Sequence, residues 1–236
     1  MNRIIDEIRV AILFLTRLPV GRLDTPPELK DAAWAFPVAG LVPAAIGWAV
    51  FSVAGGDLLG AALAVAAMML VTGGLHFDGL ADFADGIGGG RDREHVLTIM
   101  EDSRIGSYGV LALIAIALVQ VAAIAAVGHG AVFLFLGVLS RIAMLRLLTA
   151  LPPAREKGLS AIAMGAPHFW RSGVLALVLA LGVGWAALWA ALAMALVYVA
   201  VRRLCLKRMG GQTGDACGAT QLLAETAGWA ALALAA

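Results

Sequence analysis

The chain consists of long apolar blocks separated by short polar connections. A helix that crosses a membrane needs about 20 mostly apolar residues, and blocks of roughly this length occur at 33–53, 58–75, 107–127, 131–150, 173–201 and 219–236. No internal repeat or linker-like segment divides them. We therefore predict an all-α fold, a polytopic membrane helix bundle of about six to seven transmembrane helices that forms a single domain over residues 1–236.

Two of these blocks are irregular. Pro37 and Pro43 interrupt the first, which is tolerated where neighbouring helices or water satisfy the freed carbonyl groups. The block 173–201 would be about 43 Å long as one straight helix, because an α-helix rises about 1.5 Å per residue. That is too long for one upright helix and short for a full hairpin. Gly182 and Gly184 near its middle permit a steep tilt or a break, and we favour a broken or hairpin arrangement.

The first residues show a helical alternation of apolar and polar positions. One face of a helix over residues 3–16 would carry Ile4, Ile5, Ile8, Ile12 and Leu15, and the other would carry Arg3, Asp6, Glu7 and Arg9. We predict an N-terminal amphipathic helix that lies along the membrane surface and contacts lipid. An ordinary helix packed on a loop is the alternative.

The distribution of Lys and Arg predicts the orientation. Basic residues occur in the N-terminal region and in the two long loops, at Arg3, Arg9, Arg17, Arg22, Lys30, Arg91, Arg93, Arg104, Arg155, Lys157 and Arg171. The short connections 54–57 and 128–130 have none. The positive-inside rule then places the N-terminus and both long loops in the cytoplasm. The basic cluster at 202–208 belongs on the same side, which is why a broken 173–201 segment is favoured.

Composition supports this class of protein. Hydrophobic residues make up 61% of the chain, charged residues 14%, and the mean hydropathy is +0.92, whereas soluble domains are nearer half apolar and a quarter charged. The net charge of +1 is uninformative about partners, but the lack of a strongly basic patch argues against nucleic acid as a partner. Cys205 and Cys217 have no partnering Cys or His pattern, so neither a disulfide framework nor a zinc site is predicted.

Acidic residues concentrate in one segment. Seven of the 16 carboxylates lie between His76 and Arg104. Asp78, Asp82 and Asp85 have i, i+4, i+7 spacing, which places them within about 60° of one another on a helix. Carboxylates on one face repel unless a cation lies among them, and Gly79 and Gly86 beside them would let a ligand approach the backbone. We favour a Mg²⁺ or Mn²⁺ site that contacts phosphate oxygens over a solvated acidic helix end.

Two further clusters and one buried charge complete the candidate site. In Met100–Gly109, Asp102 could extend the metal site and Arg104 suits a phosphate, although Ser103 or Asp102 could simply cap the next helix. In Gly210–Thr220, Thr213 and Gly214 form a tight turn into a helix that suits ligand binding, with Asp215 as a ligand or general base; a plain turn and helix cap is the alternative. Arg141, inside an apolar block, is expected to face a phosphate or a carboxylate.

Five segments, in order from about residue 11 to residue 225, together resemble one known family. The segments are Phe-Leu-Thr-Arg-Leu-Pro-Val at 14–20, Phe-Pro-Val-Ala-Gly-Leu at 36–41, Gly-Leu-His-Phe-Asp-Gly-Leu-Ala-Asp at 74–82, Met-Glu-Asp-Ser-Arg-Ile-Gly at 100–106 and Gly-Gln-Thr-Gly-Asp-Ala-Cys-Gly-Ala at 211–219. They are similar to the cobalamin synthase (adenosylcobinamide-GDP ribazoletransferase) family. The Asp-Gly-Leu-Ala-Asp and Thr-Gly-Asp motifs are the specific parts of this resemblance.

The resemblance implies an integral enzyme of the cell inner membrane with its active site facing the cytoplasm. It implies transfer that joins adenosylcobinamide-GDP to α-ribazole or its 5′-phosphate, releases GMP and requires Mg²⁺. Combined with the clusters above, our hypothesis makes Asp78, Asp82 and Asp85 the metal ligands and Arg104 and Arg141 the phosphate contacts. Thr213 and Gly214 would bind substrate, and Asp82, Asp102 and Asp215 would share the catalytic roles. A homo-oligomer is a further expectation.

Two other classes of protein fit parts of the same pattern. Asp82-x-x-Asp85-Gly86 is similar to part of the CDP-alcohol phosphotransferase signature, but the Ala-Arg pair and the downstream Asp-x3-Asp of that signature are missing. A membrane transporter would also contain buried charges and broken helices, yet the inverted repeats typical of many carriers are not evident.

Overall fold

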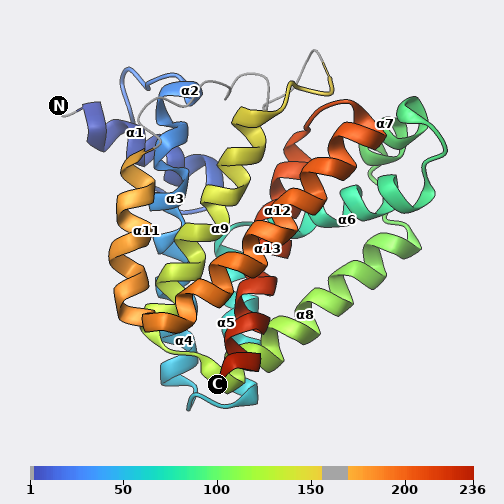
Figure 1. Cartoon of the computed structure of the whole chain (residues 1–236). Helices are drawn as coiled ribbons and strands as arrows, with labels where there is room; N and C mark the ends of the chain where they lie inside the picture. Colours follow the sequence, from blue (N-terminus) through green and yellow to red (C-terminus); the bar gives the residue numbers. More distant parts are fainter. Residues whose placement is uncertain (1–2, 156–169) are drawn as a thin grey trace.

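The chain is an all-helical bundle, described from a computed structural model that covers residues 3–155 and 170–236 (Figure 1). Its helices are α1 (Arg3–Leu15), α2 (Leu29–Ala32), η1 (Ala33–Ala35), α3 (Phe36–Ala39), α4 (Leu41–Val53), α5 (Leu58–Val71), α6 (Leu75–Gly89), α7 (Arg93–Glu101), α8 (Ser107–Val127), α9 (Gly130–Ala150), α11 (Trp170–Val183), η2 (Gly184–Ala186), α12 (Ala187–Met209) and α13 (Gly214–Ala235). The predicted fold class, a membrane helix bundle with an N-terminal helix, is confirmed.

Helix α13 forms the centre of the bundle, packed against α6, α8, α9 and α12. Most of its residues are buried, including Trp229. Helix α9 is the second central element, and about two thirds of the residues in its apolar stretch are buried. The outer helices α8 and α11–α12 bury only about a fifth of theirs and expose large apolar side chains, as expected of surfaces that contact lipid. The most buried helices therefore carry the polar residues, and the exposed ones are apolar.

Fewer helical segments meet the criterion of length and apolarity for a span than the six to seven predicted, and one of them contains the break between α11 and α12. Within the described residues, four helical segments meet this criterion: Leu29–Val53, Ser107–Val127, Gly130–Ala150 and Trp170–Met209. The pair α5 and α6 would make a fifth. The block expected at 219–236 forms α13, which does not meet the criterion. Its buried polar residues, such as Gln221 and Glu225, are hidden by the surrounding helices.

The segment 173–201 is broken, as favoured from the sequence. Helix α11 ends at Val183, a single 3-10 turn follows, and α12 begins at Ala187. Gly184 adopts a left-handed φ of +78° at this break, a conformation that a glycine reaches without steric cost. The two helices leave the break in different directions (Figure 1), so α12 returns toward the end of the bundle at which α11 began.

The block 58–75 is also not one straight span. Helix α5 ends at Val71, and α6 departs from it at 90° after a short turn in which Gly73 and Gly74 both have positive φ. Helix α6, which carries the predicted acidic triplet, consequently crosses the bundle instead of continuing along it (Figure 1). This bend brings the acidic face of α6 against the beginning of α13.

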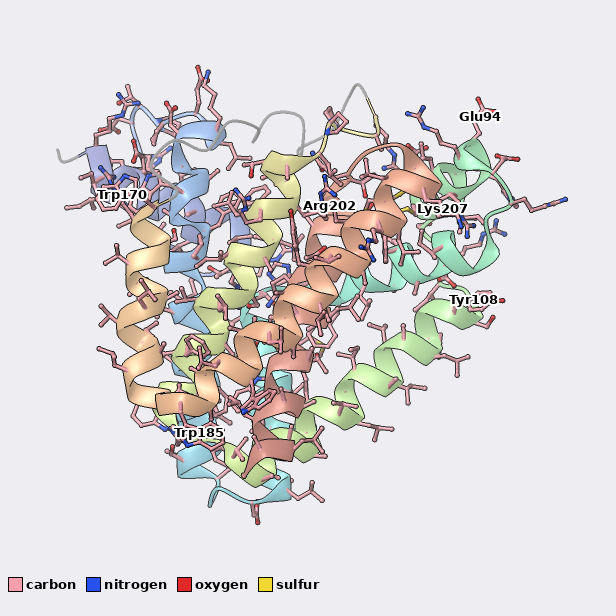
Figure 2. The ribbon with its side chains drawn as sticks, viewed as in Figure 1. Glu94, Tyr108, Trp170, Trp185, Arg202 and Lys207 are labelled. Atoms are coloured by element: carbon pink, nitrogen blue, oxygen red, sulfur yellow. The ribbon has the colours of Figure 1, made fainter. Side chains whose placement is uncertain are left out.

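The basic segments gather at one end of the molecule. Helices α1, α2 and α7 and the C-terminal end of α12 lie at the upper end in Figure 1, and the short connections α4–α5 and α8–α9 lie at the lower end. Glu94 and Lys207 mark the charged end in Figure 2, whereas Trp185 marks the other. This separation agrees with the charge pattern that predicted the orientation. Lys157, one of the predicted cytoplasmic residues, lies outside the described residues.

Helix α1 forms as predicted, but its polar face is not fully exposed. Glu7 is buried and accepts a hydrogen bond from the Trp34 indole at 2.7 Å and one from Arg3 at 3.0 Å. Ile4 and Ile5, placed on the apolar face, are exposed. The helix packs on η1 and α3 through Ala11 and Leu15 together with this satisfied carboxylate. Assigning Glu7 to the polar, outward side was therefore wrong.

Candidate active site

The acidic triplet lies on one helix, as the spacing predicted, but its three members differ in burial. Asp78, Asp82 and Asp85 all belong to α6. Asp78 is exposed, Asp82 is half-buried and Asp85 is buried. Asp82 lies within electrostatic range of the other two and also of Asp215, which belongs to α13. Folding thus collects four carboxylates from two distant segments of the chain.

The approach of α6 to α13 depends on glycine. A Cβ atom at Gly79 would lie 2.9 Å from the carbonyl oxygen of Asp215 and 3.1 Å from its Cα. Gly218, on the facing helix, lies over the backbone of His76. The expectation that Gly86 leaves room for a ligand was wrong, because a Cβ there would lie 2.5 Å from the Met100 side chain. Gly79 packs against the beginning of α13 and also lines a pocket beside it. Both glycines permit close packing of helices.

Arg155 is the cation of this cluster, and sequence reasoning missed its role. Its Nε lies 3.2 Å from Glu101 Oε1, its Nη1 lies 4.0 Å from Asp215 Oδ2, and its Nη2 donates to the Leu97 carbonyl at 3.0 Å. A parallel bridge between Pro153 and Gln212, with Ala154 N–H donating to Gln212 O at 2.7 Å, holds the preceding loop beside the start of α13. In the sequence, Arg155 counted only as one positive charge in a long loop.

The environment of Asp215 combines burial with charge. Burial raises the pKa of the Asp215 carboxyl above its ordinary value, Arg155 opposes this shift, and the nearby carboxylate of Asp78 adds to it. Asp215 also occupies the first turn of α13, whose free N–H groups favour negative charge. A partly buried carboxylate beside other carboxylates is the kind of group that binds a cation or accepts a proton in an enzyme.

Asp85 has a structural partner of its own. Its Oδ2 accepts a hydrogen bond from Gly106 N–H at 2.7 Å, and its Oδ1 accepts one from Gly109 N–H at 2.9 Å. Both donors belong to the start of α8, which has no side-chain cap of its own. Asp85 therefore caps α8 from α6, and neither Ser103 nor Asp102 does, contrary to the alternative considered from the sequence. Because Gly106 and Gly109 have no Cβ atom, the Asp85 carboxylate fits against their backbone.

Asp102 and Arg104 pair with each other at the surface between α7 and α8. Arg104 Nη2 lies 2.6 Å from Asp102 Oδ2, and the guanidinium side chain is 86% exposed. Hydrogen bonds from Arg104 lower the pKa of Asp102 to about 2. In the described part of the chain, no interaction joins this pair to Asp82 or Asp215.

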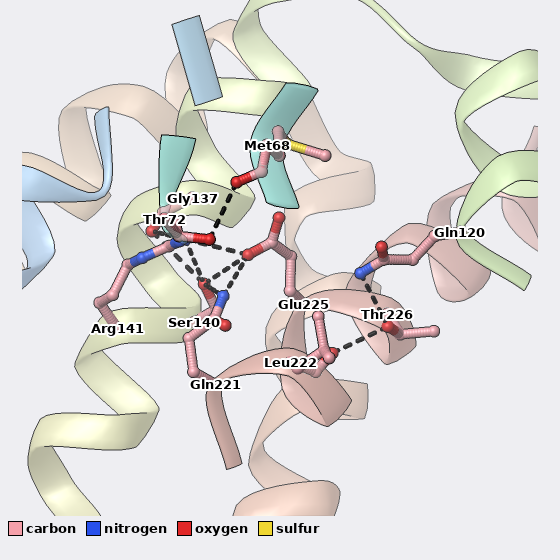
Figure 3. Close-up of polar contacts among 10 residues, drawn as sticks. All are labelled: Met68, Thr72, Gln120, Gly137, Ser140, Arg141, Gln221, Leu222, Glu225 and Thr226. Carbon is pink, nitrogen blue, oxygen red and sulfur yellow. Dashed lines mark hydrogen bonds and ion pairs between the residues drawn. The ribbon is translucent and has the colours of Figure 1, made fainter. Parts of the chain in front are cut away.

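Arg141 lies in a buried polar network in the bundle. The sequence predicted that it faces a phosphate or a carboxylate, and it faces the carboxylate of Glu225. Its Nη1 lies 2.9 Å from Glu225 Oε2 and donates to Ser140 Oγ at 3.2 Å, while Gln221 also donates to Glu225 (Figure 3). Gln120 donates to Thr226 at 2.9 Å beside it. Arg141 and Glu225 are 4% and 6% exposed. This network ties α9 to α13.

The Gly210–Thr220 segment serves mainly as a turn and helix cap. Gly210 ends α12 in a left-handed conformation, and Thr213 Oγ1 accepts from Ala216 N–H at 3.1 Å as the N-cap of α13. Thr213 is buried, whereas a Cβ added to Gly214 would meet nothing within 4 Å. Of the two predicted substrate-binding residues, Gly214 therefore borders open space and Thr213 supports the helix.

The carboxylates suit a hard cation. Oxygen ligands are those that Mg²⁺ prefers, and Asp78, Asp82 and Asp215 supply them where mutual repulsion would be relieved by positive charge. Across residues 3–155 and 170–236, no group of three or more His, Cys, Asp or Glu side chains is already arranged around a common metal position. The donor chemistry fits Mg²⁺, and ligation would require these side chains to rearrange.

Fold and site together define a polytopic membrane protein with an acidic cluster where α6 meets the beginning of α13. The sequence places it more narrowly, because residues 7–233 match the model of the cobalamin-5-phosphate synthase family. The chain belongs to that family. The predicted resemblance is thereby confirmed over nearly the whole chain.

Individual relatives agree with the family match. A protein of Sinorhizobium medicae named adenosylcobinamide-GDP ribazoletransferase is 42% identical over 254 residues, covering 98% of this chain and 97% of its own length. A protein of the same name from Bradyrhizobium diazoefficiens is 41% identical over 241 residues, covering 95% of this chain and 92% of its own. No solved structure matches the chain significantly.

Proposed function

We propose that this chain is an adenosylcobinamide-GDP ribazoletransferase that requires Mg²⁺. It would join adenosylcobinamide-GDP to α-ribazole or α-ribazole 5′-phosphate, giving adenosylcobalamin or its 5′-phosphate and GMP. The observation that carries the proposal is the meeting of Asp78 and Asp82 with Asp215 and Arg155 at the junction of α6 and α13. A diphosphate substrate needs such a combination of metal-binding carboxylates and a cation.

In this proposal a ribose hydroxyl attacks the phosphorus attached to cobinamide, and the bond to GMP breaks. Asp78, Asp82 and Asp215 would hold the Mg²⁺, with Asp85 beside them fixing α8. Bound Mg²⁺ supplies positive charge that offsets the charge on the diphosphate. One of Asp82 and Asp215 would take the proton of the attacking hydroxyl, because both are partly shielded from water and lie beside further carboxylates.

The cations divide into contacts for the substrate and contacts for the fold. Arg155 would bind the diphosphate next to Asp215, and the exposed Arg104 would exchange Asp102 for a phosphate group. Arg141 would keep α9 and α13 together, since its charge is already satisfied by Glu225. Gly214 would let the substrate approach the first N–H groups of α13.

The proposed location is the cell inner membrane, with the site facing the cytoplasm. Asp215 of the acidic cluster lies beside Arg155 of a long basic loop, and basic segments remain on the cytoplasmic side. The large apolar surfaces of α8 and of α11–α12 would contact lipid.

The test is turnover by membranes that contain the chain, supplied with adenosylcobinamide-GDP, α-ribazole 5′-phosphate and Mg²⁺, with chromatographic detection of the cobalamin product and GMP. Product formation should stop with a chelator and return with added Mg²⁺. Asp82→Asn should abolish turnover while the protein remains in the membrane.

Asp57→Asn is the matched control, because Asp57 caps α5 at the far end of the bundle and asparagine is an equally good cap. Its turnover should equal that of the unchanged protein. No product from a folded, inserted chain would refute the proposal, and release of CMP from a CDP-alcohol would favour the related phosphotransferase chemistry.

A further inference from the structure

A mostly apolar pocket of about 150 Å³ lies beside the acidic cluster. Phe14, Leu15, Phe36, Met144 and Leu148 form its apolar walls, and the Phe14 and Phe36 rings stack on each other with centroids 5.3 Å apart. Asp78, Asp215 and Gly214 line it as well. The pocket therefore joins an apolar, aromatic wall to the carboxylates of the proposed active site.

His76 supplies a second, independent feature that indicates a ligand. His76 lies between this pocket and a small polar cavity lined by Arg141 and Glu225, is only 3% exposed, and within the described chain neither of its ring nitrogens has a hydrogen-bond partner. Buried polar groups in native proteins are normally paired, and each unpaired one calls for an explanation. A ligand with a polar edge in this pocket would satisfy the imidazole.

We propose that this pocket binds the aromatic base of the acceptor nucleoside, an inference that rests on the proposed function. A cavity of about 150 Å³ holds a benzene ring, so this pocket suits part of a small, flat aromatic base and is far too small for a corrin. The apolar walls hold the faces of the base, His76 bonds its polar edge or a sugar hydroxyl, and the attached ribose reaches the carboxylates of Asp78 and Asp215.

The connectivity of the two substrates separates the acceptor base from guanine. Only the ribose lies between the acceptor base and the attacking hydroxyl, so the base must bind within one sugar of the carboxylates. A ribose and a further phosphate lie between guanine and the attacked phosphorus. Guanine also carries several donors and acceptors, which a wall of leucine, methionine and phenylalanine side chains would leave unpaired.

Leu148 offers a direct test because its side chain lines the pocket and is buried. Leu148→Phe should raise the KM for α-ribazole 5′-phosphate by about tenfold or more, as expected when a pocket for an apolar group is narrowed. The KM for adenosylcobinamide-GDP should not change. Leu148→Ala should shift the preference toward a nucleoside with a bulkier base. Leu181→Phe, the same replacement at a position 82% exposed on α11, should change neither KM.

A binding measurement separates this proposal from the proposed function. α-Ribazole should bind the unchanged protein in equilibrium dialysis without Mg²⁺ and without the second substrate, and Leu148→Phe should weaken that binding. A rise in the KM for adenosylcobinamide-GDP instead, or unchanged KM values in both Leu148 variants, would overturn the pocket assignment while turnover by the unchanged protein kept the proposed function. If Leu148→Phe does not fold, the base preference of Leu148→Ala decides.

Discussion

Replacement of Gly79 by alanine should separate the two halves of the acidic cluster. The new methyl group would lie 2.9 Å from the carbonyl oxygen of Asp215 and 3.1 Å from its Cα, closer than an ordinary van der Waals contact, which begins at 3.4 Å. Both neighbours are backbone atoms and cannot rotate away. The clash must therefore be relieved by moving α6 and α13 apart by about 0.5 Å.

The expected magnitudes follow from this geometry. Overpacking a close contact destabilises the folded state by about 1–3 kcal/mol. Alanine in place of a helical glycine stabilises it by about 0.5–1 kcal/mol. The free energy of unfolding of the variant should therefore fall by about 1–2 kcal/mol. Misplacement of catalytic groups by about 1 Å costs about 100-fold in rate. A shift of half that size should lower turnover about tenfold.

Gly173→Ala, on the outer helix α11, is the control. Its added methyl group would meet no heavy atom within 4 Å. This variant should keep full turnover and gain about 0.5–1 kcal/mol from helix propensity. Thermal unfolding in detergent and the turnover assay measure both effects. Equal behaviour of the two variants, or full activity of Gly79→Ala, would refute the reasoning.

Two further predictions concern buried carboxylates. Asp85→Asn should destabilise the protein by about 1–3 kcal/mol, because the charged acceptor of the Gly106 and Gly109 N–H groups is lost; an unchanged melting temperature would show that Asp85 does not cap α8. Glu225→Gln should cost about 3–5 kcal/mol, because it leaves the charge of Arg141 buried without its counter-charge. Replacing both partners, Arg141→Met with Glu225→Leu, should recover most of that loss in the same unfolding measurement, and no recovery would argue against a paired charge.

The regular features of the fold could be predicted from the sequence because they depend on local chemistry. Uninterrupted apolar residues predicted the helices 107–127 and 131–150 almost to the residue. The helical spacing of Asp78, Asp82 and Asp85 predicted that they share a helix, and the position of the basic residues predicted which end of the bundle they share. Gly184 was recognised as a point where 173–201 could break, since glycine alone reaches its φ of +78° without strain.

The tertiary structure decided which of those residues meet. A 90° bend after α5 brings α6 against the start of α13, and close packing at Gly79 brings Asp215 to the triplet. A bridge between Pro153 and Gln212 places Arg155 beside Asp215, although the two residues are far apart in the sequence.

Helix packing also determined that Asp85 accepts hydrogen bonds from the start of α8 and that Arg141 pairs with Glu225. Residue type and spacing thus determined the helices, the class of chemistry and the family, because each of these depends on neighbours along the chain. The partner of each charged group depends on helix packing, which a single sequence does not specify.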